Sequence, residues 1–122
     1  MMLVWYSVMH MMHPDLIALG SHTYYMSDSS NLGIYVSGSD AFLIDSGRNR
    51  DAGKRMLRLL IDSGLHLAGI INTHSHADHI GGNAYLQRQT GCRIWAPEKE
   101  ACFIAHPELE PAFLYGGFPH DG

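Results

Sequence analysis

The stretch Ile-Ile-Asn-Thr-His-Ser-His-Ala-Asp-His-Ile-Gly-Gly, residues 70–82, decides how this chain is expected to fold and what chemistry it can carry. An apolar run ends there, and the pattern H-x-H-x-D-H follows from His74 to His79. Imidazole nitrogens and carboxylate oxygens are ligands that suit zinc, iron and manganese. Alternate side chains of an extended backbone share a face, so we expect His74 and His76 to converge on one ion. Asp78 and His79 follow where the chain turns, and we expect them to serve a second ion close by.

A pair of ions at this loop would have a defined chemistry. Two metals about 3.5–4 Å apart can hold a bridging hydroxide and stabilise both the attacking and the leaving oxygen. A catalytic zinc lowers the pKa of its water to about 7, which supplies a nucleophile at neutral pH. The alternative is a plain solvated loop after a buried strand. Gly81 and Gly82 favour the metal site, because glycines let backbone approach closely and start the next helix tightly.

Two segments resemble a known family. Thr-His-Ser-His-Ala-Asp-His-Ile-Gly-Gly at residues 73–82 resembles the signature of the metallo-β-lactamase superfamily of metallo-hydrolases. Phe-Leu-Ile-Asp-Ser-Gly at residues 42–47 resembles the apolar strand of that family, which ends in Asp-x-Gly. The match in order and spacing runs from about residue 16 to residue 96. The resemblance implies an α/β fold, a layered sheet with outer helices that forms half of a four-layer αββα sandwich.

The resemblance also implies a ligand set. His74 and His76 would hold the first metal, and Asp78 and His79 the second, with Asp78 catalytic as well. Zinc is expected, as one or two ions, with iron or manganese as alternatives. Family members usually add a third first-site histidine, a bridging aspartate and a second-site histidine from their C-terminal half.

Those C-terminal ligands have no matching motif in this chain. After His79 the only histidines are His106 and His120, and the only aspartate is Asp121. Neither histidine has the Gly-His-Thr-like context of the family. We therefore interpret residues 15–122 as the N-terminal half of a metallo-β-lactamase-like domain and residues 1–14 as an N-terminal extension. Alone, such a half is expected to bind metal weakly and to hydrolyse slowly.

Asp45 ends an expected buried strand, at a position where active-site groups tend to lie in α/β sheets. One interpretation is a carboxylate that does not bind the metal itself but orients a ligand histidine. The other is a turn or capping aspartate ahead of Gly47. The family resemblance favours the first interpretation.

Hydrophobic periodicity and turn residues predict the order of the elements. The helix at residues 50–63 is expected to begin after Asn49, to end at Gly64 and to bury Met56, Leu57, Leu60 and Ile61. A second helix is expected to follow the metal loop, with Asn83 as its N-cap. The full expected order is antiparallel strands at 16–19 and 23–26, a hairpin of 32–36 and 41–44, the helix at 50–63, a buried strand at 65–71, a helix at 83–90, a strand at 93–96 and a helix from Pro97 to near His106.

Composition describes a globular chain of one domain. Its 122 residues are 46% hydrophobic and 16% charged, with a net charge of −4 and no basic patch, so nucleic-acid binding has no electrostatic support.

Cys92 and Cys102 form no C-x-x-C pair, and we interpret them as free buried thiols of a reducing compartment. Residues 1–12 contain no Lys or Arg and are too short for the roughly 20 residues that a membrane span needs. We therefore expect a cytoplasmic protein without a membrane partner.

The function expected from these observations is metal-dependent hydrolysis of a small-molecule ester, thioester, lactone, amide or phosphoester by a metal-bound hydroxide. Two alternatives remain: a metal-binding module without turnover, and a di-iron redox enzyme on the same scaffold. A structural half exposes apolar surface, so we also expect either a homo-oligomer or a missing C-terminal half as partner.

Overall fold

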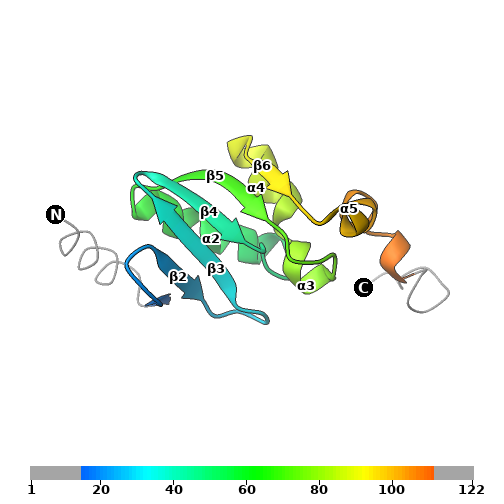
Figure 1. Cartoon of the computed structure of the whole chain (residues 1–122), viewed down its shortest axis with the longest axis horizontal. Helices are drawn as coiled ribbons and strands as arrows, with labels where there is room; N and C mark the ends of the chain where they lie inside the picture. The colour runs from blue at the N-terminus through cyan, green and yellow to red at the C-terminus, as the bar shows by residue number, and fades with distance from the viewer. Residues whose placement is uncertain (1–14, 112–122) are drawn as a thin grey trace.

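A single six-stranded sheet forms the centre of the molecule (Figure 1). The computed structural model describes residues 15–111, so the expected extension at 1–14, His120 and Asp121 lie outside the described residues. The strands follow one another across the sheet in sequence order: β1 Leu16–Ala18, β2 Thr23–Met26, β3 Leu32–Ser37, β4 Asp40–Ile44, β5 His66–Ile71 and β6 Arg93–Trp95. Strands β1 to β4 pair antiparallel, whereas β4, β5 and β6 run parallel. The predicted α/β fold class, with its antiparallel start and its β-α-β unit, is confirmed.

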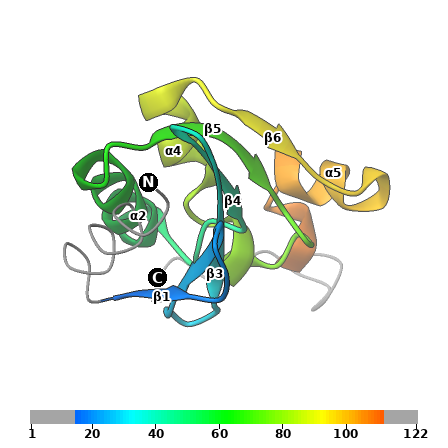
Figure 2. The same cartoon turned by 60° about the vertical axis from the view of Figure 1, so that its left-hand side comes forward.

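Helices cover one face of this sheet. Figure 2 shows α2 (Arg50–Asp62) and α4 (Asn83–Thr90) on the same side of the strands. Two further helices, α3 (Ala77–Ile80) and α5 (Glu98–Ala105), lie beyond the ends of the parallel strands (Figure 1). One helix layer on one sheet is the arrangement expected of half an αββα sandwich.

Helix α2 begins and ends where the sequence predicts. The Asn49 side chain accepts a hydrogen bond from the Ala52 amide at 2.9 Å, and Gly64 leaves the helix with φ +68°. The prediction that Ile61 is buried was wrong, because its side chain is 64% exposed. Leu59, which was not predicted to be buried, is only 5% exposed. Helix α2 packs on α4 as well as on the sheet, and Gly53 lies against Gly82 at the start of α4. Because of this second contact, the buried face of α2 is shifted by one residue from the predicted one.

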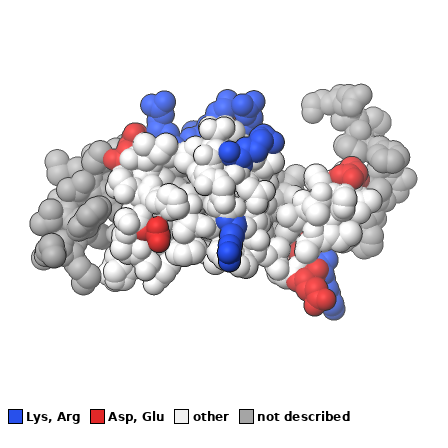
Figure 3. Space-filling model, turned by 90° about the horizontal axis from the view of Figure 1, so that it is seen from above, with Lys and Arg blue, Asp and Glu red and all other residues white. Residues whose placement is uncertain are grey.

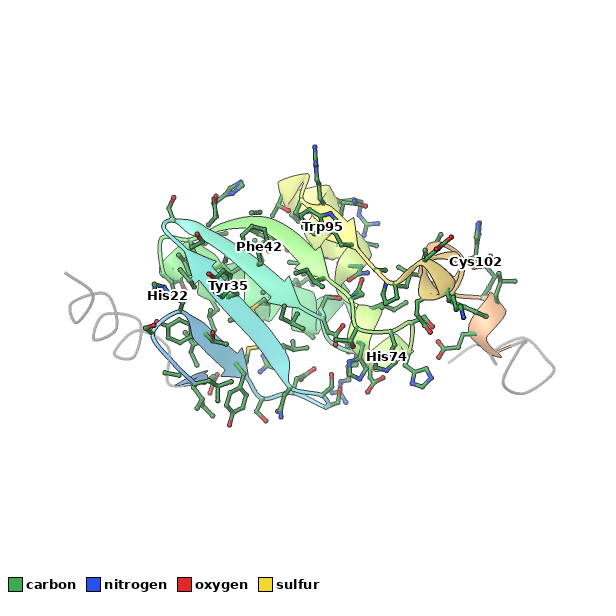
Figure 4. The ribbon with its side chains drawn as sticks, viewed as in Figure 1. His22, Tyr35, Phe42, His74, Trp95 and Cys102 are labelled. Carbon is green, nitrogen blue, oxygen red and sulfur yellow. The ribbon has the colours of Figure 1, made fainter. Side chains whose placement is uncertain are left out.

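Other sequence-based details also differ from the structure. Gly82, not Asn83, occupies the N-cap position of α4, and the side chain of Asn83 is buried below it. The short helix α3 was not predicted. Cys92 is a buried free thiol as expected, but Cys102 is exposed on α5 (Figure 4). It is exposed because α5 lies at the edge of the molecule, where none of its residues is fully buried.

The surface carries charges of both signs. On the face shown in Figure 3, basic side chains gather near the middle of the molecule and acidic ones lie at several places around them. Every helix in residues 15–111 is too short or too polar to span a bilayer. The expectations of a cytoplasmic location and of no nucleic-acid partner stay predictions.

Candidate metal centre

The candidate site lies at the carboxyl ends of β4 and β5. These strands are parallel neighbours, with Ile44 opposite Ile71, so the residues that follow each strand meet at the same edge of the sheet. Asp45 follows β4, and the H-x-H-x-D-H segment follows β5, with Ala77–Ile80 coiled into α3. Figure 4 shows His74 at this edge, between the sheet and α5. Parallel pairing therefore brings together residues that are about 30 positions apart in the chain.

The side chain of Asp45 makes three hydrogen-bond contacts at this edge. Its Oδ1 accepts the Thr73 N–H at 2.8 Å, and its Oδ2 accepts the Thr73 hydroxyl at 2.7 Å. The same Oδ2 lies 2.8 Å from His79 Nδ1. Asp45 is 4% exposed and has φ +66°, a left-handed conformation that costs a non-glycine residue about 1–3 kcal/mol. Such strain persists where surrounding contacts hold it, and the contact with His79 favours a carboxylate that orients this histidine over a plain turn residue.

The imidazoles of His74 and His79 lie side by side. Their ring centroids are 4.0 Å apart, and His74 Nδ1 is 2.8 Å from the Thr73 hydroxyl oxygen. Among the described residues, Asp45, His74 and His79 form a group in which one potential ligand atom of each lies within 4.8 Å of the others. Two imidazoles and a carboxylate are a donor set that fits zinc and similar metals.

The two remaining predicted ligands flank this group. The His76 ring lies 4.7 Å from the His74 ring, and its Nε2 is 3.6 Å from Glu110 Oε1. Asp78 Oδ2 lies 3.4 Å from His79 Nε2. Each expected pair, His74 with His76 and Asp78 with His79, is thus adjacent, although neither His76 nor Asp78 belongs to the tight group. The roles of these four residues as ligands, and of Asp78 in catalysis, stay predictions.

Glu100 is a residue of the site that sequence analysis missed. Its Oε2 accepts the Ser75 N–H at 2.8 Å, from 25 positions further along the chain. Hydrogen bonds from the Ser75 side chain and then its backbone, followed by the charges of His74 and His76, hold the pKa of Glu100 below its usual value. Only the placement of α5 reveals this contact, since nothing in the sequence spacing connects the two residues.

A buried network of polar side chains contacts the backbone of His79, and sequence analysis did not predict it. The Asn83 amide donates to Asn72 Oδ1 at 2.7 Å, and its Oδ1 accepts the Ser46 hydroxyl at 2.7 Å. Asn72 Nδ2 and Ser46 Oγ each lie 3.4 Å from the His79 carbonyl oxygen, and the Ser46 N–H donates to that oxygen at 2.8 Å. Because each polar group has partners, this network can fix the backbone of α3 without an unsatisfied buried atom.

Comparison with known proteins assigns the family. The model of the metallo-beta-lactamase superfamily matches residues 27–121. The chain belongs to the metallo-β-lactamase superfamily. The resemblance seen at residues 42–47 and 73–82 is therefore confirmed.

Individual relatives of this superfamily member are longer than the chain. A hydroxyacylglutathione hydrolase of Rhodopseudomonas palustris is 39% identical over 79 residues, which are 65% of this chain and 31% of that protein. One from Thiobacillus denitrificans is 46% identical over 44 residues, 35% of this chain and 17% of that protein. The chain thus spans about a third or less of these relatives.

Solved structures show the same fold. The FIM-1 metallo-β-lactamase from Pseudomonas aeruginosa, in a mono-zinc form, aligns with a TM-score of 0.66 at 19% identity, over 74% of this chain and 44% of that one. The Rm3 metallo-β-lactamase aligns with a TM-score of 0.64 at 26% identity, over 73% of this chain and 34% of that one. The metallo-β-lactamase scaffold predicted from the sequence is thereby confirmed for the described part of the chain.

Proposed function

We propose that this chain carries the N-terminal ligands of a zinc-dependent hydrolase that cleaves a thioester of a small molecule. The convergence of the His74 and His79 imidazoles at one strand edge, with the Asp45 carboxylate hydrogen-bonded to His79, is the observation that carries the proposal. The similarity to hydroxyacylglutathione hydrolases supports a hydroxyacyl thioester of glutathione as the substrate class. His74, His76, Asp78 and His79 would hold the metal. When bound, zinc would act as a Lewis acid and lower the pKa of a water to about 7.

Asp45 would prepare His79 for this role. An ionised carboxylate only accepts hydrogen bonds, so the 2.8 Å contact with Oδ2 requires the proton of His79 to be on Nδ1. The other ring nitrogen, Nε2, is then unprotonated and available as a ligand. Both oxygens of Asp45 already accept hydrogen bonds from Thr73 or His79, which favours an orienting role for the carboxylate over direct ligation.

Thr73 would connect Asp45 to His74 and set the tautomer of that imidazole as well. The Thr73 hydroxyl gives its single proton to Asp45 Oδ2, so its oxygen can only accept from His74 Nδ1 at 2.8 Å. His74 Nδ1 then carries the proton, and its Nε2 is free. One buried carboxylate therefore sets the tautomer of two imidazoles, one directly and one through a hydroxyl.

Thr73→Val is expected to weaken zinc binding about 10-fold, at the lower end of the range for outer-shell partners. Valine keeps the shape of threonine but removes the hydroxyl, so His74 loses the contact that fixes its tautomer. A matched control is Thr90→Val, because the Thr90 hydroxyl bonds only backbone within and just after α4. Zinc affinity measured by competition with a chromophoric chelator checks the prediction. Equal affinities for the two variants would contradict it.

The hydrolase proposal itself is tested with the 122-residue chain and a hydroxyacylglutathione thioester. We expect slow, zinc-dependent loss of thioester absorbance that stops on chelation and returns with added zinc. Following the thioester rather than the released thiol avoids the exposed thiol of Cys102. Persistent inactivity of the fully zinc-loaded chain would support a binding module instead. Bound iron with oxygen-dependent turnover would support a redox enzyme.

The open face of the sheet supports association as a further part of the proposal. Tyr35, Phe42 and Trp95 lie on the face opposite the helices (Figure 4), where Tyr35 is 47% and Trp95 is 43% exposed. The rings of Phe42 and Trp95 are 6.4 Å apart, and Trp95 covers Gly69.

Sedimentation velocity at micromolar concentration is expected to show a dimer. Trp95→Glu is expected to weaken this dimer, whereas Ile61→Glu, on the helix side, is not. A clean monomer would contradict this expectation.

A further inference from the structure

Helix α5 contacts the candidate metal centre through the side chain of Glu100. None of the residues of α5, Glu98–Ala105, is fully buried. Glu100 nevertheless reaches the loop after β5, where its Oε2 accepts the Ser75 N–H at 2.8 Å. Ser75 is only 6% exposed and lies between His74 and His76 in the chain. A carboxylate from α5 therefore holds the backbone link between two predicted ligands.

This contact has the properties of a strong restraint. A hydrogen bond from a backbone N–H to an ionised carboxylate is roughly twice as strong as one between neutral groups. The loop at residues 72–76 has no regular secondary structure. The N–H groups of Asn72 and Thr73 are hydrogen-bonded at its start, and the bond from the Ser75 N–H adds a restraint near its end. A second carboxylate from the same C-terminal segment lies nearby, with Glu110 Oε1 at 3.6 Å from His76 Nε2. The segment after β6 thus meets the H-x-H loop at two points.

We propose that Glu100 is a positioning residue of the metal centre, which fixes the Ser75 amide and thereby the relative placement of His74 and His76. This inference rests on the proposed metal-binding function. A loop held in its binding conformation before the metal arrives loses less conformational entropy when the metal binds. Helix α5 then becomes a structural part of the centre, although it supplies no ligand.

A purely structural role for Glu100 would be to stabilise α5 through the helix dipole. Acidic residues in the first turn of a helix are favourable there, and both Glu98 and Glu100 occupy the first turn of α5. Glu98 is exposed and lies two positions before Glu100. The substitution Glu98→Gln makes the same change in charge and length as Glu100→Gln, within the same turn of α5, without touching the Ser75 amide. It serves as the matched control.

The test measures zinc affinity and amide exchange in the 122-residue chain. We expect Glu100→Ala to weaken zinc binding by up to about 10-fold, the lower end of the range for partners of ligand side chains, because Glu100 acts through the Ser75 amide. Glu100→Gln keeps a neutral acceptor of the same length and is expected to lose less. Glu98→Gln is expected to bind zinc as the parent chain does. Without metal, the Ser75 N–H is expected to exchange with solvent faster in Glu100→Ala than in Glu98→Gln.

The outcomes separate this inference from the proposed function. A parent chain that binds no zinc would overturn the proposed function. A parent chain that binds zinc, with unchanged affinity and unchanged Ser75 exchange in Glu100→Ala, would overturn the positioning role alone. Equal losses in Glu98→Gln and Glu100→Gln would show that only the stability of α5 matters, which also overturns it. Circular dichroism of each variant checks that the fold is retained.

Discussion

Asp45→Gly is expected to lower the zinc affinity of this chain by about 10–100-fold, the range observed when an outer-shell partner of a ligand histidine is removed. The carboxylate of Asp45 accepts from His79 Nδ1 at 2.8 Å and, through Thr73, influences His74 as well. Without it, neither imidazole is held in the tautomer that leaves Nε2 free. Glycine is the informative replacement, because Asp45 has φ +66° and glycine adopts this conformation without strain.

The control for this prediction lies at the other end of the same strand. Asp40 also faces a histidine, with Oδ1 at 3.4 Å from His66 Nδ1, but this pair is exposed and remote from the metal loop. Asp40→Gly is expected to leave zinc affinity unchanged, whereas Asp45→Asn, which keeps one carbonyl oxygen, is expected to lie between the two. Chelator competition measures all three affinities. If Asp45→Gly bound zinc as tightly as Asp40→Gly, the orienting role of Asp45 would be wrong.

Gly81→Ala is expected to destabilise the fold by about 1–3 kcal/mol, the usual cost of overpacking. A Cβ at Gly81 would clash with the Arg48 carbonyl group and with the Asn49 nitrogen. These are backbone atoms at the start of α2, so they cannot move aside as a flexible side chain could. The Gly81 N–H also donates to the Gly47 carbonyl at 2.7 Å, which ties α3 to the loop after Asp45.

Urea unfolding of Gly81→Ala beside Gly20→Ala measures this effect. Gly20 has no atom within 4 Å of the added Cβ, so its substitution is expected to change the free energy of unfolding by less than about 0.5 kcal/mol. We expect Gly81→Ala to lose zinc affinity as well, because the shifted backbone would move His79 away from Asp45. Equal midpoints for the two variants would contradict the close approach of α2 and α3.

Much of this fold could be predicted from the sequence, because local patterns and short connections determine it. The apolar run before Asn72 and the cap at Asn49 mark a β-α-β unit, and parallel pairing then brings Asp45 beside the H-x-H-x-D-H segment. The glycines after the histidines were predicted to allow close approach, and Gly81 and Gly82 do pack against backbone. Those features depend on neighbours in sequence or on adjacent strands.

The missed features depend on tertiary packing. Leu59 rather than Ile61 is buried because α2 contacts α4 as well as the sheet, and no pattern within α2 reports the second contact. Asn83 fits an N-cap by residue type, yet its side chain turns inward to bond Asn72 and Ser46. Glu100 fits the first turn of a helix equally well, and only the position of α5 shows that it reaches Ser75.

X-ray absorption at the zinc edge of the metal-loaded 122-residue chain tests the central claim most directly, because it reports the atoms that surround the ion. The account predicts at least two imidazole nitrogens at about 2.0–2.1 Å from zinc, and their loss in a His74→Ala, His79→Ala double variant. A hydrated zinc spectrum without imidazole scattering, or one that the double variant leaves unchanged, would contradict it.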